Sequence, residues 1–498
     1  MSLAIIFTRA RVGIHAPLVT VEVHLSNGLP GLSIVGMPET VVKESKDRVR
    51  SALINSQFEF PARRITINLA PADLPKDGSR FDLPIAIGIL VASGQLSVEK
   101  LEQWEFIGEL ALSGNLRPVT AILPAAVACG NDHRQLMTNT NNAEQAALYD
   151  PCQAFGAATL LEVCQHLQAE VLLPQAIAPD PPAHIINADF VDIIGQEFAK
   201  RALEIAATGG HNLLLYGPPG TGKTMLASRL PGIMPPLTPE EAITVASVYS
   251  LCGTHYPQWN QPSFRNPHHS SSAVALVGGG SQPKPGEISL SHCGILFLDE
   301  LPEFQRQVLE VLREPLESGE IHIARAHAQV TFPARFQLIA AMNPCPCGYY
   351  GSPSEKHHCR CSTEQIKRYR QKISGPLLDR IDLHIAVDPV STSDLQASTE
   401  GEISEAIRKR VIKGRRIQQQ RQSKVNARLT KHELKRYCQL GSEEQQFLLQ
   451  AIEKLGLSIR AHDKILKISR TIADLEPCDD IEKKHIIEAL AFRNFDRK

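Results

Sequence analysis

One stretch of the chain satisfies the pattern GxxxxGK[ST] at every position: Gly217-Pro218-Pro219-Gly220-Thr221-Gly222-Lys223-Thr224. It follows a short apolar run, Asn212–Tyr216, and precedes a segment of helical pattern from Met225. A strand, a glycine-rich loop and a helix in this order are the context of a phosphate-binding loop (P-loop). Its glycines let backbone N–H groups point at phosphates, Lys223 can reach the outer phosphates, and Thr224 can ligate Mg²⁺. The stretch therefore predicts an ATP and Mg²⁺ site.

Length and composition indicate a large globular protein of several domains. The chain has 498 residues, 43% of them hydrophobic and 21% charged, with a net charge of −1. These values exclude global disorder and rod-like proteins. The longest uncharged run, Leu83–Val98, is interrupted by Pro84 and is too short for a membrane span of ~20 apolar residues. Without an evident secretory signal, we expect a cytoplasmic protein that makes no membrane contact.

Four segments are predicted along the chain. Residues 1–173 mix alternating strand-like runs, such as Leu18–Leu25 and Arg64–Ala70, with a helical stretch. Residues 174–190 are rich in proline, which opposes helix and central strand, and are predicted to be a linker. Apolar runs separated by helical segments in 191–389 predict an α/β core with a parallel sheet. Residues 390–498 have the periodic apolar pattern of helices.

The second buried run of the core, Gly294–Leu298, ends in two carboxylates, Asp299 and Glu300. Asp299 can hold the Mg²⁺ shell, while Glu300 can orient and deprotonate the attacking water. The pair implies ATP hydrolysis rather than nucleotide binding alone.

A third run ends at Asn343, and the three motifs together resemble an AAA+ ATPase. This resemblance gives Asn343 the sensor-1 role of polarising the water or the γ-phosphate; the alternative is a turn-forming asparagine before Pro344. The segment Gly375–Asp382 (GPLLDRID) resembles the arginine-finger segment of MCM helicases and magnesium-chelatase motor subunits. The resemblance implies that Arg380 serves the ATP of a neighbouring subunit. The alternative is a structural arginine paired with Asp379 or Asp382.

Three further segments are similar to parts of the same branch of AAA+ proteins. Leu457–Arg460 resembles sensor 2, so Arg460 is the expected residue and Arg470 the alternative. The stretches Val277–Ile288 and Glu320–Phe336 resemble a helix-2 insert and a pre-sensor-1 hairpin, which line the pore of related ring motors. The resemblance makes Lys284, Arg325 and His327 candidate DNA contacts, with an ordinary solvated loop as the alternative for each.

Four of the 11 cysteines fall in two CxC pairs within one short polar loop: Cys345, Cys347, Cys359 and Cys361. In a reducing compartment such clustering favours metal binding over disulfides. Four thiolates suit tetrahedral Zn²⁺ in a closed, structural site. His357 or His358 could replace one ligand, and four reduced cysteines are the alternative.

The N-terminal segment resembles the Lon-protease type (S5-type) α+β fold. Leu74–Asp82 (LPKDGSRFD) is similar to the region of the Lon nucleophile, but Arg80 stands at the nucleophile's position and Ser79 one residue early. Gly114–Ala125 is similar to the segment that carries the catalytic lysine, and it contains no lysine. A serine without its base is not activated. We expect a Lon-like domain without a protease dyad.

Taken together, these features identify the chain as a member of the ComM/YifB family of magnesium-chelatase-like AAA+ proteins. The resemblance implies a homo-hexameric, DNA-dependent ATPase that works with recombination proteins. It also implies a branch-migration helicase that extends the integration of incoming single-stranded DNA during natural transformation. Its DNA partners would be single-stranded and branched.

A basic stretch supports a DNA partner independently of the resemblance. Residues 408–436 contain twelve Lys and Arg residues and one acidic residue, Glu433. Such a stretch can neutralise phosphates and give salt-dependent binding, although a solvated helical face is the alternative. A chelatase-like or protein-remodelling motor that acts on a partner protein is the competing function, and a slow nucleotide-gated scaffold is a third.

Overall fold

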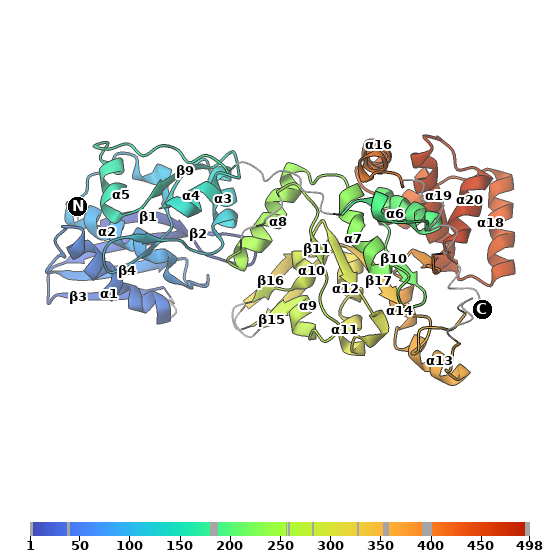
Figure 1. Cartoon of the computed structure of the whole chain (residues 1–498). Helices are drawn as coiled ribbons and strands as arrows, with labels where there is room; N and C mark the ends of the chain where they lie inside the picture. Colours follow the sequence, from blue (N-terminus) through green and yellow to red (C-terminus); the bar gives the residue numbers. More distant parts are fainter. Residues whose placement is uncertain are drawn as a thin grey trace. The chain divides into compact units, whose positions relative to one another are not determined.

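A computed structural model describes residues 3–36, 40–179, 188–254, 256, 259–280, 283–325, 328–351, 358–390 and 401–493. The chain forms two compact units (Figure 1). The first contains Met1–Pro182, Pro239–Trp259 and Ala324–Phe332, and the second contains Ala183–Thr238, Asn260–Ile323 and Pro333–Lys498. The units therefore coincide with the predicted segments only in part. Two stretches of the predicted core belong to the first unit, and the C-terminal helices share a unit with the rest of the core.

The first unit is built on a seven-stranded mixed sheet of order β3-β4-β2-β1-β5-β8-β9. Its strands are β1 (Leu3–Arg9), β2 (Leu18–Ser26), β3 (Gly31–Val35), β4 (Arg64–Ala70), β5 (Trp104–Phe106), β8 (Gln135–Asn139) and β9 (Gln153–Ala157). Alternate residues of β2 and β4 are buried, as in a sheet with one face on the core. The two strands predicted from alternation, Leu18–Leu25 and Arg64–Ala70, are thereby confirmed.

Helices and a short ribbon complete this unit: α1 (Thr40–Asn55), α2 (Asp82–Ser93), α3 (Ile122–Asn131), α4 (Thr140–Ala146), α5 (Leu160–Leu167), β6 (Glu109–Leu110) and β7 (Leu116–Arg117). The long uncharged run forms α2, which packs on β1 and β2. Gly88 permits this close approach, because an added Cβ would meet Val23 Cγ2 at 2.5 Å. None of the described helices is long and apolar enough to cross a membrane.

The first unit also holds α8 (Pro239–Leu251), which follows the P-loop helix in the sequence. Ala246 of α8 joins a buried apolar cluster with Ile122 of α3, and Ala121 N–H donates to Ser250 O at 2.9 Å. The start of the predicted linker is ordered against β9, because Ala176 N–H donates to Ala154 O at 2.8 Å. Residues 180–187 of that linker lie outside the described residues.

The second unit contains a five-stranded parallel sheet of order β11-β14-β17-β10-β18. Its strands are β10 (Leu213–Tyr216), β11 (Phe264–Arg265), β14 (Ile295–Leu298), β17 (Gln337–Met342) and β18 (Leu383–Ala386). Every residue of β14 and β17 is buried, which is why these strands, apart from Gln337 at the start of β17, have continuous apolar sequences rather than alternating ones. The parallel α/β core predicted from the sequence is confirmed.

Short helices and a hairpin complete this unit: α6 (Glu197–Gly209), α7 (Lys223–Ile233), α9 (Ala273–Val277), α10 (Glu287–Leu290), α11 (Arg306–Glu310), α12 (Arg313–Ser318), α13 (Thr363–Gln371), α14 (Gly375–Leu378), β12 (Gly278–Gly279) and β13 (Lys284–Pro285). Two more strands, β15 (Glu320–Arg325) and β16 (Ala328–Pro333), pair with each other, and Ala324–Phe332 of this hairpin belongs to the first unit. The pairs β12–β13 and β15–β16 form two-stranded sheets, so both predicted inserts contain hairpins.

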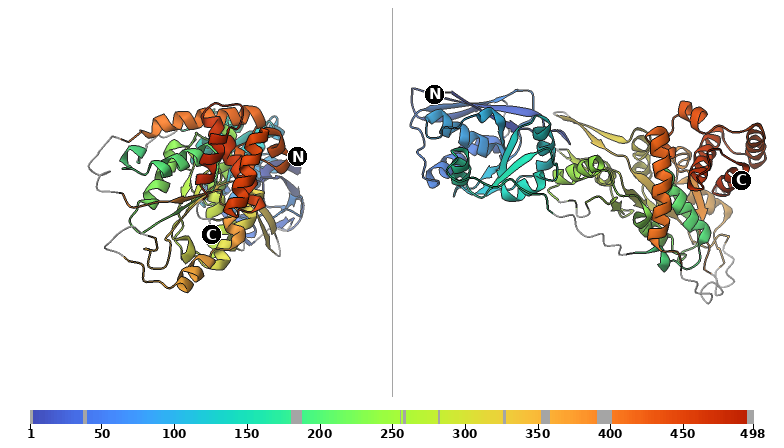
Figure 2. Two further views of the ribbon diagram at one scale, coloured as in Figure 1. Left: turned by 90° about the vertical axis from the view of Figure 1, so that its right-hand side faces the viewer. Right: turned by 90° about the horizontal axis from the view of Figure 1, so that it is seen from above.

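The C-terminal part is helical, as predicted, with α16 (Ser404–Gln422), α17 (Lys431–Tyr437), α18 (Ser442–Leu455), α19 (Ile459–Leu475) and α20 (Lys483–Ala491). These helices share one buried apolar cluster with the parallel sheet; Val411, Ile468 and Leu213 all belong to it. The right-hand view of Figure 2 shows α16 along its length beside α6.

The core of the first unit contains a buried charge cluster whose removal we expect to destabilise the protein. Glu105 is fully buried and accepts from Arg9 Nε at 2.7 Å and from Arg134 Nη1 at 3.1 Å. Glu105→Ala leaves the buried guanidinium of Arg9 without its main partner, which costs about 3–5 kcal/mol. Denaturant unfolding followed by circular dichroism measures the loss. The exposed Glu102→Ala is the matched control, and an equal effect of both substitutions would contradict this explanation.

Candidate nucleotide site and metal centre

The parallel sheet brings the predicted ATP-binding groups to one edge. The P-loop follows the carboxyl end of β10, Asp299 and Glu300 follow β14, and Asn343 follows β17. The pairing of β10 with β17 and of β17 with β14 is parallel, so the three strands end side by side. Ligands of open α/β sheets bind at this carboxyl edge.

Lys223 lies at the centre of the loop. Its Nζ donates to Gly217 O at 2.8 Å, to Pro218 O at 2.7 Å and to Asn343 Oδ1 at 3.2 Å. Burial lowers the pKa of Lys223 below its usual value. The nearby Asp299 acts in the opposite direction, but its effect is smaller. A buried ammonium held by neutral oxygens is suited to an anion, because phosphate oxygens compensate its charge better than carbonyl groups do.

The loop backbone has the shape that a phosphate group requires. Gly222 has a φ of +85°, in the left-handed region, and caps α7, which begins at Lys223. An added Cβ at Gly220 would meet no atom within 4 Å, so the mouth of the loop is open. Thr221 Oγ1 donates to Pro218 O at 3.0 Å and closes the turn. The N-terminus of α7 therefore presents its amides to the loop, which fits the phosphates of ATP.

Two oxygen ligands for Mg²⁺ converge beside the loop. Thr224 Oγ1 donates to Asp299 Oδ2 at 2.7 Å, and Asp299 Oδ1 accepts from Glu300 N–H at 2.9 Å. A hydroxyl and a carboxylate at this spacing suit a hard cation that keeps several waters and also binds substrate phosphates. The residues present therefore fit Mg²⁺.

The side chain of Glu300 pairs with a histidine that the sequence did not single out for this role. His269 Nδ1 lies 3.2 Å from Glu300 Oε2, and the His268 ring lies against that of His269, with centroids 4.1 Å apart and the ring planes inclined at 34°. Both histidines belong to the segment Phe264–His269, so two adjacent histidines there were the available signal. Glu300 is half exposed and is therefore accessible to water.

Arg380 lies at the amino ends of the parallel strands, whereas the P-loop lies at their carboxyl ends. It precedes β18, which runs parallel to β10 with Leu213 opposite Leu383. The P-loop instead follows the far end of β10, one strand length of about 13 Å away at ~3.3 Å per residue. Topology thus separates Arg380 from the P-loop of its own chain.

Acidic side chains surround the guanidinium of Arg380. It forms an ion pair with Glu317 of α12 and donates to Pro376 O at 2.6 Å. The open pocket that it lines also contains Glu310, Arg313, Glu314 and Ser318. The backbone O of Arg380 accepts from Asn212 Nδ2 at 2.8 Å, which ties this loop to the start of β10. The ion pair of Arg380 is therefore with Glu317, and not with Asp379 or Asp382, the two aspartates considered as its structural partners.

Those aspartates hold the Arg380 loop to α19 instead. Asp379 pairs with Arg460 Nη1 at 2.8 Å, and Asp382 Oδ1 lies 3.5 Å from Lys464 Nζ. His211 Nδ1 lies 3.2 Å from Asp382 Oδ2. Burial raises the pKa of Asp382, but Lys464 and His211 outweigh it, so that the pKa lies well below its usual range.

The two candidate sensor-2 arginines differ in position. Arg460 is largely exposed beside the Arg380 loop. Arg470 is buried and donates to Asp474 Oδ1 at 3.0 Å and to Asp479 O at 2.6 Å. An arginine bound in this way inside the helical bundle is a structural residue, so the geometry favours Arg460.

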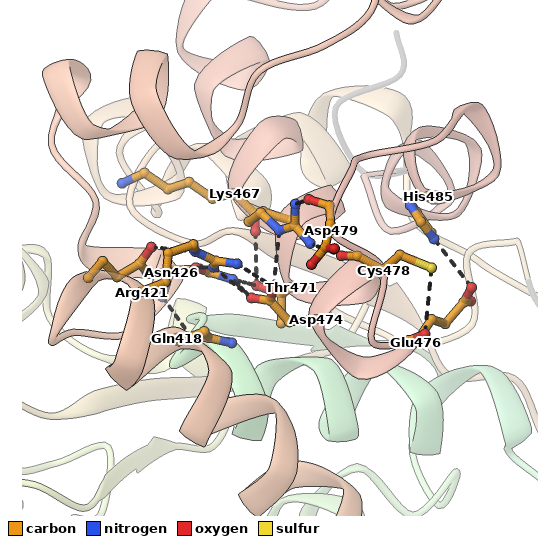
Figure 3. A network of polar contacts seen from close by, with 12 residues as sticks. Gln418, Arg421, Asn426, Lys467, Thr471, Asp474, Glu476, Cys478, Asp479 and His485 are labelled. Carbon is orange, nitrogen blue, oxygen red and sulfur yellow. Dashed lines mark hydrogen bonds and ion pairs between the residues drawn. The ribbon is translucent and has the colours of Figure 1, made fainter.

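The basic stretch 408–436 divides into structural and exposed residues. Arg421 forms a bidentate pair with the buried Asp474, at 2.6 and 2.8 Å (Figure 3). Arg415 donates twice to Ala207 O of α6, at 3.0 and 2.7 Å. Among the exposed basic residues of α16, Arg410 forms ion pairs with Glu402 and Glu204. The other three, Lys409, Lys413 and Arg416, are spaced i, i+4 and i+7 and therefore share one face.

The thiolate cluster has the dimensions of a tetrahedral metal site. The Sγ atoms of Cys345, Cys347, Cys359 and Cys361 all lie within 4.8 Å of one another. Three of the pairs are 3.4, 3.7 and 3.6 Å apart. A tetrahedron with Zn–S bonds of ~2.3 Å has edges of about 3.8 Å. Backbone N–H donors of Tyr349 and Arg360 lower the pKa of Cys347 to about 6, which favours its thiolate. At Cys359 and Cys361 a backbone hydrogen bond also lowers the pKa, but desolvation and the neighbouring thiols outweigh it, so the pKa of each is raised.

The cluster is formed by four cysteines, and its fit to Zn²⁺ supports the predicted ligand set. His358 is exposed outside this group, while His357 lies outside the described residues. A second group, Glu476, Cys478 and His485, is less suited to a metal (Figure 3). His485 Nδ1 accepts from Glu482 N–H at 3.0 Å, so the proton of a neutral ring sits on Nε2 and points at Glu476.

Of the three candidate DNA contacts on the hairpins, the structure describes the side chain of only Lys284. Lys284 is exposed on β13. The side chain of Arg325 and the whole of His327 lie outside the described residues.

In the N-terminal unit, an arginine fills the place of the Lon nucleophile. Arg80 is fully buried, and its Nη2 donates to Thr120 O at 2.6 Å, within the segment that would carry the Lon lysine. Burial lowers the pKa of Arg80 to about 10. Ser79 Oγ donates to the carboxylate of Glu109, and Lys76 Nζ donates to Pro71 O. That the domain has no protease dyad stays a prediction.

A parallel sheet with a P-loop, an acidic pair and a polar strand tip at one edge defines the AAA+ class of P-loop ATPases. Models of magnesium chelatase subunit ChlI match residues 189–395 and 21–142, and a model of its C-terminal region matches 401–493.

Full-length relatives agree with these matches. The competence protein ComM of Haemophilus influenzae is 54% identical over 99% of this chain and 98% of its own length. YifB of Salmonella typhimurium is 52% identical over 100% of this chain and 98% of its own. The magnesium-chelatase 38 kDa subunit of Cereibacter sphaeroides is 25% identical over 31% of this chain and 52% of its own. The chain belongs to the ComM/YifB family of magnesium-chelatase-like AAA+ proteins.

Two substitutions separate nucleotide binding from hydrolysis. Lys223→Ala removes a charged donor to phosphate and should weaken ATP binding by about 1.5–3 kcal/mol. Glu300→Gln keeps the size of the side chain but cannot accept the proton of water, so turnover should fall about 10²–10⁴-fold. Binding of a fluorescent ATP analogue and phosphate release measure the two effects. A Glu300→Gln protein with wild-type turnover would exclude the role given to Glu300.

Proposed function

We propose that this protein is an ATP-driven DNA translocase that promotes branch migration while incoming single-stranded DNA recombines during natural transformation. The observation that carries the proposal is the exposed basic row Lys409, Lys413 and Arg416 on α16, within the same compact unit as the ATP site. The similarity to a competence protein over the full chain supports the biological setting.

The ATP site supplies the proposed energy source. Lys223 would neutralise charge on the outer phosphates, and Thr224 with Asp299 would hold the Mg²⁺, which would supply further neutralising charge. Asn343, whose Oδ1 accepts a hydrogen bond from Lys223, would orient the attacking water, and Glu300 would accept the proton of that water. During this step the contact between His269 and Glu300 must break, or the two side chains must share the proton that Glu300 accepts.

The position of Arg380 supports a ring of identical subunits, as in the predicted homo-hexamer. Because Arg380 stands at the edge of the sheet opposite its own P-loop, it can complete only the site of another chain. Phosphate charge would then replace Glu317 as the partner of Arg380. Arg460, held beside it by Asp379, enters the same interface.

A chelatase-like motor that acts on a partner protein remains the competing proposal, supported by the ChlI matches. The two functions differ in what stimulates hydrolysis. A DNA motor hydrolyses ATP faster when single-stranded or branched DNA is present, whereas a protein-directed motor is indifferent to DNA. The decisive assay is ATP-driven movement of a three- or four-way DNA junction; a protein that hydrolyses ATP but moves no junction would exclude the helicase proposal.

The basic row makes a quantitative prediction about salt. Changing Lys409, Lys413 and Arg416 together to alanine should reduce the slope of log affinity for duplex DNA against log salt by about two to three, since each phosphate contact contributes ~0.9. Fluorescence anisotropy over a salt series measures the slope. The control changes three exposed basic residues of the first unit, Lys46, Arg63 and Lys100, to alanine. Equal slopes in the two variants would show that the row on α16 is not the DNA contact.

A further inference from the structure

The cysteine-rich loop touches the ATP site at two points, one on each side of its first two cysteines. On one side, Asn343 stands two residues before Cys345, and its Oδ1 accepts from Lys223 Nζ at 3.2 Å. On the other side, Gly348 is buried against Pro219 of the P-loop. An added Cβ at Gly348 would meet Pro219 Cδ at 2.7 Å and Cγ at 3.2 Å.

The segment between these two points is a tight turn. Gly348 N–H donates to Cys345 O at 3.0 Å, and Gly348 has a φ of +86°, in the left-handed region. Two of the four clustered thiols, those of Cys345 and Cys347, lie within the turn. Any ligand that fixes these two sulfurs therefore fixes the backbone that presents Asn343 to Lys223 and Gly348 to Pro219.

The other half of the cluster restrains the turn from a distant part of the loop. Cys359 Sγ lies 3.7 Å from Cys345 Sγ and 3.6 Å from Cys347 Sγ. Helix α13 follows and adds a second restraint, because Arg370 Nε donates to Pro344 O at 3.4 Å. A metal bound to four thiolates would replace these loose sulfur contacts with bonds of fixed length.

We propose that the four-cysteine cluster is a positioning element of the ATP site: metal bound by the cysteines and nucleotide bound by the P-loop strengthen each other's binding through the Asn343–Gly348 turn. The proposal rests on the proposed ATP and zinc sites. Coupling between two sites is reciprocal and typically changes affinity about 5–150-fold. Nucleotide should therefore hold the metal as strongly as the metal holds nucleotide.

The direct test measures metal release from the full-length protein. Purified protein is loaded with Zn²⁺, and release to a chromogenic chelator is followed with and without a non-hydrolysable ATP analogue and Mg²⁺. We expect the analogue to slow release about five-fold or more. This readout does not depend on ATP turnover.

Two glycines of the same loop give a matched pair of variants. Gly348→Ala places a Cβ on the Pro219 ring at a positive φ, and should reduce the analogue's effect on Zn²⁺ release to nearly none. Gly351→Ala imposes a similar backbone cost, since its φ is +76°, but its Cβ would meet nothing within 4 Å. It should keep the wild-type effect. Pro219→Ala removes the opposing ring atoms without adding backbone strain and should also reduce the effect.

The outcomes separate this proposal from those on which it depends. Protein that retains no Zn²⁺ would overturn the zinc site, and protein that binds no analogue would overturn the ATP site. Each of these results overturns the coupling as well. Wild-type protein that binds both, yet releases Zn²⁺ equally fast with and without the analogue, overturns the coupling alone. Wild-type coupling that survives in both Gly348→Ala and Pro219→Ala excludes the Gly348–Pro219 contact as its route.

Discussion

Parallel hydrogen bonding between β10 and its neighbours β17 and β18 is the constraint on which the rest of the second unit depends. Parallel strands share one carboxyl edge and one amino edge. The carboxyl edge gathers the P-loop, the acidic pair and Asn343. The amino edge carries Arg380 and, through Asp379, Arg460. Under the proposal that Arg380 serves a neighbouring subunit, a single chain holds both halves of an ATP site, at opposite edges of one sheet.

This separation accounts for the ion pair between Arg380 and Glu317. In the proposed ring, an arginine that awaits another chain still needs a counter-charge, and Glu317 provides one. The loop behind it is fixed by bonds to Asn212 and to α19, so its backbone is positioned before a partner arrives. Such preorganisation lowers the cost of completing a site between subunits. The same helix α19 carries Thr471, which lies 2.8 Å from His211 beside β10, so the helical part and the sheet are bonded directly.

Much of the second unit was predictable because its signals are local. The P-loop, the apolar runs and the two CxC pairs each lie within a few residues, and the structure brings all of them together. Long-range pairings were not predictable. Nothing in the sequence alone indicates that His269 pairs with Glu300, or that Arg421 of the basic stretch forms an ion pair with Asp474 inside the helical bundle. Likewise, α8 follows the P-loop helix in sequence yet packs in the first unit, where its Ala246 joins a buried apolar cluster with residues of α3.

The claim that the ATP site is shared between subunits can be tested by mixing two inactive variants. Lys223→Ala protein keeps Arg380 but lacks the P-loop lysine, and Arg380→Ala protein keeps the P-loop but lacks the finger. In a ring assembled at random from equal amounts, about a quarter of the interfaces combine both intact halves. ATP turnover of the mixture should then rise well above that of either variant, towards a quarter of wild type. Turnover no higher than the average of the two variants, in mixtures shown to form mixed rings, would contradict a site completed by Arg380 of a neighbour.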